Sequence, residues 1–365
     1  MQAREWLALA RLPGMGAARL AELVAARPDW PDGWLAVLPR EAAIALRLWL
    51  DHSARSPLSA ALSADEAWLG AEPGRHLIHP DHPAWPRLLG QIADPPPVLW
   101  ALGDLKALGP PRLTMVGSRR PTREGLTNAA GFARELAGRG WCVVSGMALG
   151  IDAAAQQAAL EAGGSSVGVL GCGVDVIYPP RHHRLHRRLQ ESGGLLLSEH
   201  PPGTPARAGF FPRRNRIVTG LSLGVLVVEA AERSGSLVSA RLALEQNREV
   251  FALPGSIHNP TARGCLQLIR DGAVLVRDLD DILAELSQWA VAAVPASTPG
   301  PEPAEAREDS LLRWLSDTPT PVDALVALTG RGVADCQRGL LELELEGAVT
   351  QAAGGWVRLP TRPEA

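Results

Sequence analysis

The chain has 365 residues, of which 46% are hydrophobic and four are cysteine, and its formal net charge is −3 at pH 7. This length and apolar content predict two or three domains with buried cores, and the weak net charge means that any contact with nucleic acid must be local. The scattered cysteines argue against a metal site or disulfides, and the lack of a signal segment or a membrane-length apolar run predicts a soluble, cytoplasmic protein with no membrane contact.

Residues 1–62 are expected to form a small helical domain rich in Ala, Leu and Trp. Its turn at Leu12-Pro13-Gly14-Met15-Gly16 is similar to the hairpin of helix-hairpin-helix or SAM-like modules, in which backbone N–H groups approach a DNA phosphate. An ordinary packing unit of two helices explains the same residues equally well, because no cluster of Arg or Lys accompanies the turn.

Residues 63–105 form an irregular, Pro-rich bridge. His76, His79 and His82 share no common face on a stretch broken by proline, and no acidic or Cys partner is placed beside them, so we interpret them as turn and surface residues rather than metal ligands. The run Val98-Leu99-Trp100 follows three prolines and is predicted to be an edge strand or a lid on a sheet.

Residues 106–290 alternate apolar runs, glycine turns and helix-period segments, which predicts a Rossmann-like, doubly wound, mainly parallel α/β sheet. The carboxyl ends of its strands should face one crevice, where helix N-termini and Arg favour a phosphate-bearing ligand. A single glycine loop of this kind is well explained as a tight turn that binds no ligand. Two such loops at adjacent strand ends, one of them carrying Arg, favour a binding site. The candidate residues in these loops are Gly117, Ser118, Arg119, Arg120, Ser145, Gly146 and Gly150.

Positive charge is concentrated between Tyr178 and Arg216, where eight arginines stand against two glutamates. A solvated helix face explains residues 181–188. It explains Arg213, Arg214 and Arg216 less well, because they flank Asn215 and follow two phenylalanines. We expect residues 210–216 to precede a helix that begins at residue 217. Arginine forks for phosphates beside an aromatic platform for bases suit single-stranded nucleic acid.

Seven motifs follow one another along this domain: GSRRPTREG, SGMALGIDAAAQQAAL, GVDVIYPPRH, SEHPPG, FPRRNRIVTGLS, ERSGSLVSARLALEQNREVFALPGS and GCLQLIRDGA. In these motifs and in their order the chain resembles the DNA-processing protein A (DprA/Smf) family. The family binds single-stranded DNA, loads the RecA recombinase onto it and acts in natural transformation. It has no accepted catalytic activity, so the resemblance implies no catalytic residue, metal or cofactor. It also implies a homodimer formed through this domain, near residues 264–273.

The resemblance also assigns expected roles to individual residues. Gly117, Ser118 and Arg119 would form a phosphate pocket, and Phe211 with residues 214–215 would be the wall of a DNA groove. We expect Arg213 to converge on the same face of the sheet. A further helix N-terminus facing phosphate would begin at the residues Ser234, Gly235 and Ser236. The groove residues are Phe211, Arg213, Arg214 and Asn215.

Residues 291–307 are predicted to be a Pro/Ala linker, and residues 308–360 resemble a winged-helix domain. The expected recognition helix, residues 333–346, should repel phosphate, so a protein-contact or accessory role explains the domain at least as well as duplex binding. The acidic residues of this helix are Asp335, Glu342, Glu344 and Glu346.

Two other functions use related folds. Nucleoside-monophosphate phosphoribohydrolases of the lysine-decarboxylase-like type have a catalytic Glu in the motif PGGxGTxxE, where this chain has Val238-Ser239, although Glu229 and Glu232 lie nearby. A dehydrogenase would need a glycine fingerprint that GCGVDV lacks. We therefore rank a single-stranded DNA-binding mediator first, a phosphoribohydrolase second and a nucleotide-sensing module third.

Overall fold

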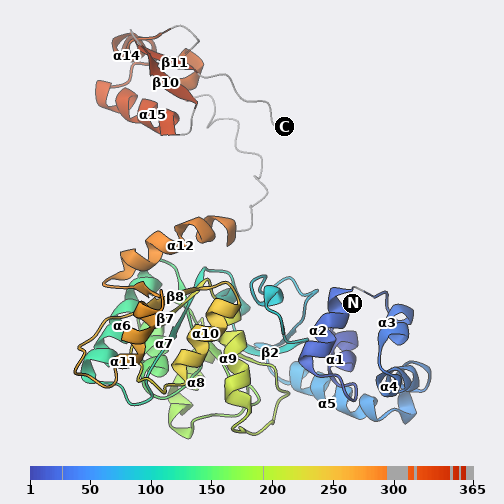
Figure 1. The fold of residues 1–365 in the computed structure, drawn as a ribbon. Coiled ribbons are helices and arrows are strands. Elements are labelled where there is room, and N and C mark those ends of the chain that lie inside the picture. Colours follow the sequence, from blue (N-terminus) through green and yellow to red (C-terminus); the bar gives the residue numbers. More distant parts are fainter. Residues whose placement is uncertain are drawn as a thin grey trace. The chain divides into compact units, whose positions relative to one another are not determined.

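In the computed structural model (Figure 1) the chain forms two compact units, Met1–Val294 and Pro295–Ala365. The described residues are 1–26, 28–191, 193–293, 311–315, 319–345, 348–352 and 355–358. The predicted linker at 291–307 lies outside them after residue 293, and so does Glu346 of the predicted recognition helix.

The first unit opens with helices α1 (Ala3–Ala10), α2 (Ala17–Ala25), α3 (Asp32–Val37), α4 (Arg40–Asp51) and α5 (Pro57–Ala71). Ser56 caps α5 with its hydroxyl, and Pro57 takes the first helical position, where no N–H is needed. Trp6 and Trp34 are almost fully buried among these helices. α5 continues to Ala71, across the boundary that the sequence places at residue 62.

A nine-stranded sheet follows, built from β1 (Arg75–Ile78), β2 (Leu99–Gly103), β3 (Arg112–Val116), β4 (Cys142–Ser145), β5 (Ser166–Val169), β6 (Leu195–Ser198), β7 (Gly224–Val227), β8 (Glu249–Ala252) and β9 (Val274–Leu275). The strand order is β1-β2-β6-β5-β4-β3-β7-β8-β9. β3 to β9 pair in parallel, whereas β1 and β2 join the β6 edge in antiparallel fashion. The mainly parallel α/β sheet predicted from the sequence is confirmed.

Two predictions for the Pro-rich bridge are wrong. The run 98–100 does not form an edge strand or a lid, because β2 lies inside the sheet, between β1 and β6. Its Trp100 is 1% exposed and packs edge-on against Trp68 of α5, so the helical segment covers it. His79 is not a surface residue either: it is 6% exposed and stacks on Trp6, with 5.8 Å between the ring centroids.

Helices cover both faces of the sheet (Figure 1). Successive residues of β3 show the alternation that builds the two cores: Leu113 and Met115 point to one face, and Thr114 points to the other, where its hydroxyl donates to the Val218 carbonyl at 2.8 Å. One face carries α6 (Arg123–Gly138), α7 (Ile151–Glu161), α8 (His183–Glu191) and α12 (Leu279–Ala293). The other carries α9 (Phe210–Gly220), α10 (Ser236–Glu245) and α11 (Arg263–Arg270).

The second unit has the winged-helix architecture that the sequence predicts. Its helices pack around Leu325, Cys336 and Leu340, and its two strands pair antiparallel. No described helix of either unit is both long enough and apolar enough to cross a membrane. The elements are the short 3-10 helix η5 (Leu311–Trp314), α14 (Val322–Thr329), α15 (Val333–Leu345), β10 (Val349–Ala352) and β11 (Gly355–Arg358).

Candidate functional site

A pocket of about 530 Å³, which we call the sheet-edge pocket, opens at the carboxyl ends of β3, β4 and β7. It brings together loops that are far apart in the sequence, as expected for a doubly wound sheet. Eleven of the fourteen candidate residues line it: Gly117, Ser118, Arg119, Arg120, Gly146, Phe211, Arg214, Asn215, Ser234, Gly235 and Ser236.

Glycines allow the loop after β3 and the loop after β4 to pack against each other. Gly150 has a φ of +84°, and a Cβ there would clash with the Ser118 carbonyl oxygen. The adjacent Ile151 N–H, at the start of α7, donates to that same oxygen at 3.2 Å. A Cβ on Gly117 would come within 2.6 Å of the Ile151 side chain. Gly150 therefore shapes the floor beneath the pocket, although it does not line it.

Glu229, at the end of β7, fixes the loop that carries Arg119. Its carbonyl oxygen accepts from the Ser118 N–H at 2.7 Å, and its carboxylate accepts from the N–H and the hydroxyl of Thr122. Thr122 is in turn the N-cap of α6, with its hydroxyl accepting from the Gly125 N–H. Glu229 is 5% exposed, so its carboxylate acts as a structural clamp rather than as a free group in the pocket.

Arg214 brings a buried positive charge to the pocket wall. The residue is 5% exposed, and its Nη1 donates to the Val169 carbonyl at 2.8 Å. The guanidinium lies against Gly146, where any Cβ would overlap it. Burial, and then repulsion from Arg119, lowers the pKa of Arg214 to about 10, while the charge of Asp152 opposes this shift. Arg214 therefore remains a cation at neutral pH, and its Nε has no hydrogen-bond partner among the described residues.

Asp152, in the first turn of α7, supports this wall from below. Its Oδ2 accepts from the Gly146 N–H at 3.1 Å and from the Ala148 N–H at 3.3 Å. Burial raises the pKa of Asp152, against the opposing effects of the Arg214 charge and these N–H donors. The carboxylate thus holds the turn after β4 beneath the Arg214 guanidinium.

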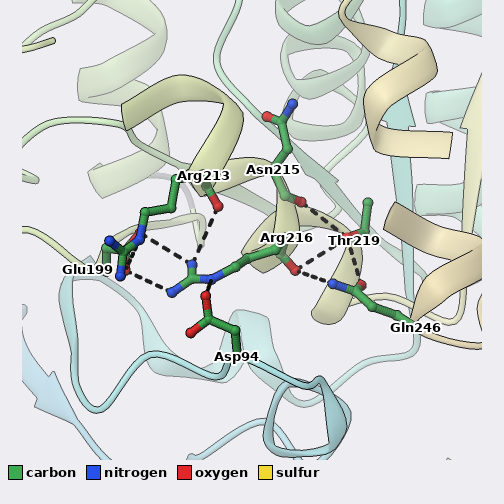
Figure 2. Close-up of polar contacts among 7 residues, drawn as sticks. All are labelled: Asp94, Glu199, Arg213, Asn215, Arg216, Thr219 and Gln246. Carbon is green, nitrogen blue, oxygen red and sulfur yellow. Dashed lines mark hydrogen bonds and ion pairs between the residues drawn. The ribbon is translucent and has the colours of Figure 1, made fainter. Parts of the chain in front are cut away.

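The helical period of α9 separates arginines that are adjacent in the sequence. Arg214 and Asn215 lie three and four positions after Phe211, so all three share the face of α9 that lines the pocket. Arg213 and Arg216 lie on another face. The Asn215 side chain points away from these two arginines (Figure 2).

Arg213 and Arg216 belong to a polar network outside the sheet-edge pocket (Figure 2). Arg216 is 6% exposed and pairs with Glu199 at 2.8 Å and with Asp94 at 3.1 Å. Arg213 lies 3.5 Å from the same Glu199 carboxylate. This network ties the Pro-rich bridge to the α/β domain. The expected convergence of Arg213 on the pocket is therefore wrong, because residues 210–216 do not precede the helix but form the first turns of α9, which turn Arg213 away from Arg214.

Ser145 likewise does not line the pocket. It is fully buried in β4, and its hydroxyl donates to the Met115 carbonyl of β3 at 2.6 Å. The loop at Ser234, Gly235 and Ser236 does open into the pocket, at the N-terminus of α10. The N–H groups of residues 236–238 already donate within this turn, so the positive end of the helix dipole is what the turn offers to an anion.

A second cavity of about 470 Å³, which we call the aromatic pocket, shares Arg119, Phe211 and Arg214 with the first. Tyr178 closes its side, with its ring centroid 5.0 Å from that of Phe211 and the two planes tilted by 34°. Tyr178 is 42% exposed, so its ring is available to a ligand. Sequence reasoning missed this residue, although it is the only Tyr of the chain and lies beside prolines in the basic stretch.

The family model for DNA recombination-mediator protein A matches residues 76–287, and that for the DprA winged helix domain matches residues 294–355. Protein Smf of Escherichia coli (strain K12) is 46% identical over 297 residues, which cover 80% of this chain and 79% of that protein. The crystal structure of DNA processing protein A from Streptococcus pneumoniae has a TM-score of 0.66 at 32% identity and covers 78% of this chain and 98% of its own. A structure of the Helicobacter pylori protein, described for its single-stranded DNA binding mode, has a TM-score of 0.51 at 32% identity and covers 58% of this chain and 96% of its own.

Proposed function

The chain belongs to the DNA recombination-mediator protein A (DprA/Smf) family, and on this premise we propose that its two adjoining pockets bind single-stranded DNA. The observation that supports this best is the shared wall of Phe211 and Arg214, with the exposed Arg119 beside it. An aromatic ring and arginine charges at one place suit a strand whose bases are free to stack.

The two kinds of contact divide between the pockets. Arg119 and Arg120 are exposed at the mouth of the sheet-edge pocket, where they can hold a backbone phosphate near the N-terminus of α10. Phe211 and Tyr178 line the aromatic pocket, where an unpaired base can stack on a ring. Paired bases of a duplex cannot reach these rings, so duplex DNA should bind more weakly.

A mobility-shift titration with matched single-stranded and duplex oligonucleotides over a salt series tests this function. We expect tighter binding of the single strand at every salt concentration, with affinity falling as salt rises because phosphate contacts release counterions. Equal affinity for both forms, or no binding of the single strand, would contradict the proposal.

Loading of a RecA-type recombinase during natural transformation, by a homodimer formed through the α/β domain, is the cellular role that the family suggests. Its test is recombinase filament growth on strands coated with single-strand-binding protein. We expect this protein to accelerate growth, and an unchanged rate with a cognate recombinase would restrict the function to DNA binding. Size-exclusion chromatography with light scattering tests the dimer, and a monomer at all concentrations would contradict it.

We also propose that the protein has no phosphoribohydrolase activity. Val238 and Ser239 occupy the place of the catalytic Glu, and the Glu229 carboxylate is occupied by Thr122. Purified protein should release no free base from nucleoside monophosphates. Base release that disappears in Glu229→Gln or Glu232→Gln would favour the hydrolase instead.

A further inference from the structure

Helix α8 starts next to the aromatic pocket and presents a row of positive charge. Tyr178, on the pocket wall, is followed by a 3-10 turn (Pro180–His182) and then by α8. Arg181, Arg184 and Arg187 are all exposed. We call these three residues the α8 ridge. Successive members are three positions apart, which is a rise of about 4.5 Å within a helix.

Two histidine contacts, one partly buried and one buried, fix the direction in which the ridge faces. His182 Nδ1 forms a hydrogen bond with the Met147 carbonyl at 3.0 Å, and Met147 lines the aromatic pocket. His186 Nε2 forms one with the Val174 carbonyl at 2.9 Å. Together with the buried Leu185 and Leu189, these contacts leave the opposite side of α8, with Arg184 and Arg187, toward solvent.

Two carboxylates near α8 are engaged elsewhere. Glu161 of α7 pairs with Arg188 at 3.2 Å and accepts from the Gln157 amide. Asp175 accepts from the Gly203 N–H at 2.8 Å. Within the described part of the chain, no carboxylate lies within ion-pair distance of the α8 ridge.

The arrangement is unfavourable for the isolated helix. The first turn of α8 contains no acidic residue, so Arg184 lies at the positive end of the helix dipole without compensation. Arg184 also repels Arg187 and Arg188, which are three and four positions further on. An anion bound along the ridge would relieve both effects, whereas a merely solvated face would gain more from mixed charge.

We propose that the α8 ridge binds backbone phosphates of the nucleotides next to those in the aromatic pocket, and so extends the DNA-binding surface beyond the two pockets. The inference rests on the proposed single-strand binding. Two features identify DNA as the ligand of the ridge: its positive charge and its continuity with the aromatic pocket. A strand that leaves the pocket past Tyr178 meets Arg181 first and α8 next. The positive row ends at Glu191, which sets the far limit of the contact.

The test compares two double variants of the full chain that each remove two positive charges. Arg184→Gln/Arg187→Gln alters the ridge. Arg40→Gln/Arg47→Gln is the matched control, because both of these arginines are exposed on α4 and have no ion pair among the described residues. Affinities for oligothymidylates of about 4 and about 16 nucleotides, the range of single-strand site sizes, are measured over a salt series, together with thermal melting.

We expect the ridge variant to bind the short strand like wild type and the long strand with a salt slope shallower by about 1.4, the value for two lost contacts to a single strand. Over a fourfold change in salt concentration this slope difference corresponds to about sevenfold in affinity. Its melting temperature should equal or exceed that of wild type, because charge repulsion within α8 is reduced. The control variant should bind both strands like wild type.

Three outcomes would overturn the inference. If the ridge variant binds the long strand with the wild-type salt slope, the ridge does not contact DNA and instead faces an acidic protein partner or solvent. Equal losses for the short and long strands, or for the ridge and control variants, would mean that only the overall charge matters. If the wild-type chain binds neither strand, the proposed function itself fails, and this outcome is distinct from the other two.

Discussion

Arg214 is the residue on which both pockets depend. Its side chain is buried, yet it belongs to the wall of two cavities and interacts electrostatically with both Asp152 and Arg119. A buried charge is tolerated only with compensation, which here comes from the Val169 carbonyl and the Asp152 carboxylate. The free charge of the site therefore lies on Arg119 and Arg120, and Arg214 mainly shapes the wall that they share with Phe211.

Arg119→Ala should weaken phosphate binding without affecting the fold, because its side chain is exposed and has no ion pair among the described residues. We expect the salt slope for a single strand to become shallower by about 0.7, the value for one lost contact. Arg213→Ala is the matched control, since Arg213 faces Glu199 away from the sheet-edge pocket. A larger change in salt slope for Arg213→Ala than for Arg119→Ala would mean that the phosphate binds on the Arg213 face of α9 and not in the sheet-edge pocket.

Phe211→Ala should remove a stacking contact and leave the salt slope nearly unchanged. The expected loss is roughly 1–3 kcal/mol of single-strand binding free energy. Phe210→Ala is the control, because Phe210 stacks on His200 instead, with 4.0 Å between the ring centroids. Melting curves separate this contact from packing: a large fall in the melting temperature of Phe211→Ala with unchanged affinity would show that the ring is structural.

His79 should make the stability of the first unit depend on pH. Burial, together with the neighbouring His82, lowers the pKa of His79 to about 4 from the ordinary 6.5. The unfolded chain therefore takes up this proton first as the pH falls, so the contribution is complete above pH 6.5 and is lost between pH 6.5 and about 4. The loss amounts to at most about 3 kcal/mol in the free energy of unfolding.

The variant His79→Phe tests this assignment, because it retains a ring against Trp6 and cannot titrate. Urea unfolding between pH 7 and 4 should show a flatter pH dependence for the variant than for wild type. Parallel pH profiles of the two proteins would assign the acid sensitivity to other groups, such as Asp81, whose pKa is lowered by its contacts with the N-terminal amine and Trp6.

At the scale of elements, the sequence predicts the sheet well and α9 poorly. Apolar runs that end in glycine turns specify β3, β4 and β7, because buried parallel strands need such runs and sharp turns at their ends. Residues 210–216 resemble a loop because Pro212 interrupts them. However, proline is tolerated in the first turn of a helix, and α9 begins at Phe210. This misassignment placed Arg213 with Arg214 and hid the separation of their side chains.

Two further errors have a tertiary cause. The run 98–100 follows prolines, so it looks like an edge strand. However, β1 pairs with it on its outer side, and the residues of β1, 75–78, lie far from it in the sequence. Ser145 looks like a pocket residue because it precedes Gly146, although its hydroxyl points into the sheet. The direction of a side chain at the last strand position depends on pairing with β3, which local pattern alone does not specify.

Glu229→Gln tests the clamp between β7 and α6. The amide keeps one acceptor for the Thr122 N–H but loses the charge beside the α6 N-terminus, so we expect about 1 kcal/mol of destabilisation. Single-strand affinity should fall with it, because Ser118 and Arg119 share this loop. Thr127→Ala, at an exposed position on the same helix, is the control. Wild-type stability and affinity in Glu229→Gln would show that the loop holds its shape without the carboxylate.

At the scale of the molecule, the weak net charge results from an uneven distribution of charge between the two units. The basic residues gather between Tyr178 and Arg216 in the first unit, while the second unit presents an acidic α15 with Asp335, Glu342 and Glu344 exposed. A winged helix that contacts duplex DNA through such a helix would have to overcome repulsion from every phosphate nearby. The first unit alone should therefore account for most of the affinity for single strands.

A chain that ends after Ala293 tests this expectation, because it keeps α12 and the core residues Leu279, Ile282 and Leu286. The first unit has its own core, so the shortened chain should melt cooperatively and bind single strands with nearly the affinity of the full chain. Arg119→Ala should lower the affinity of the shortened chain by the same factor as that of the full chain, since additivity holds for independent sites. If the shortened chain melts cooperatively but binds single strands weakly, the second unit is a main DNA contact despite its acidic helix. Its contact with DNA would then involve surfaces other than α15.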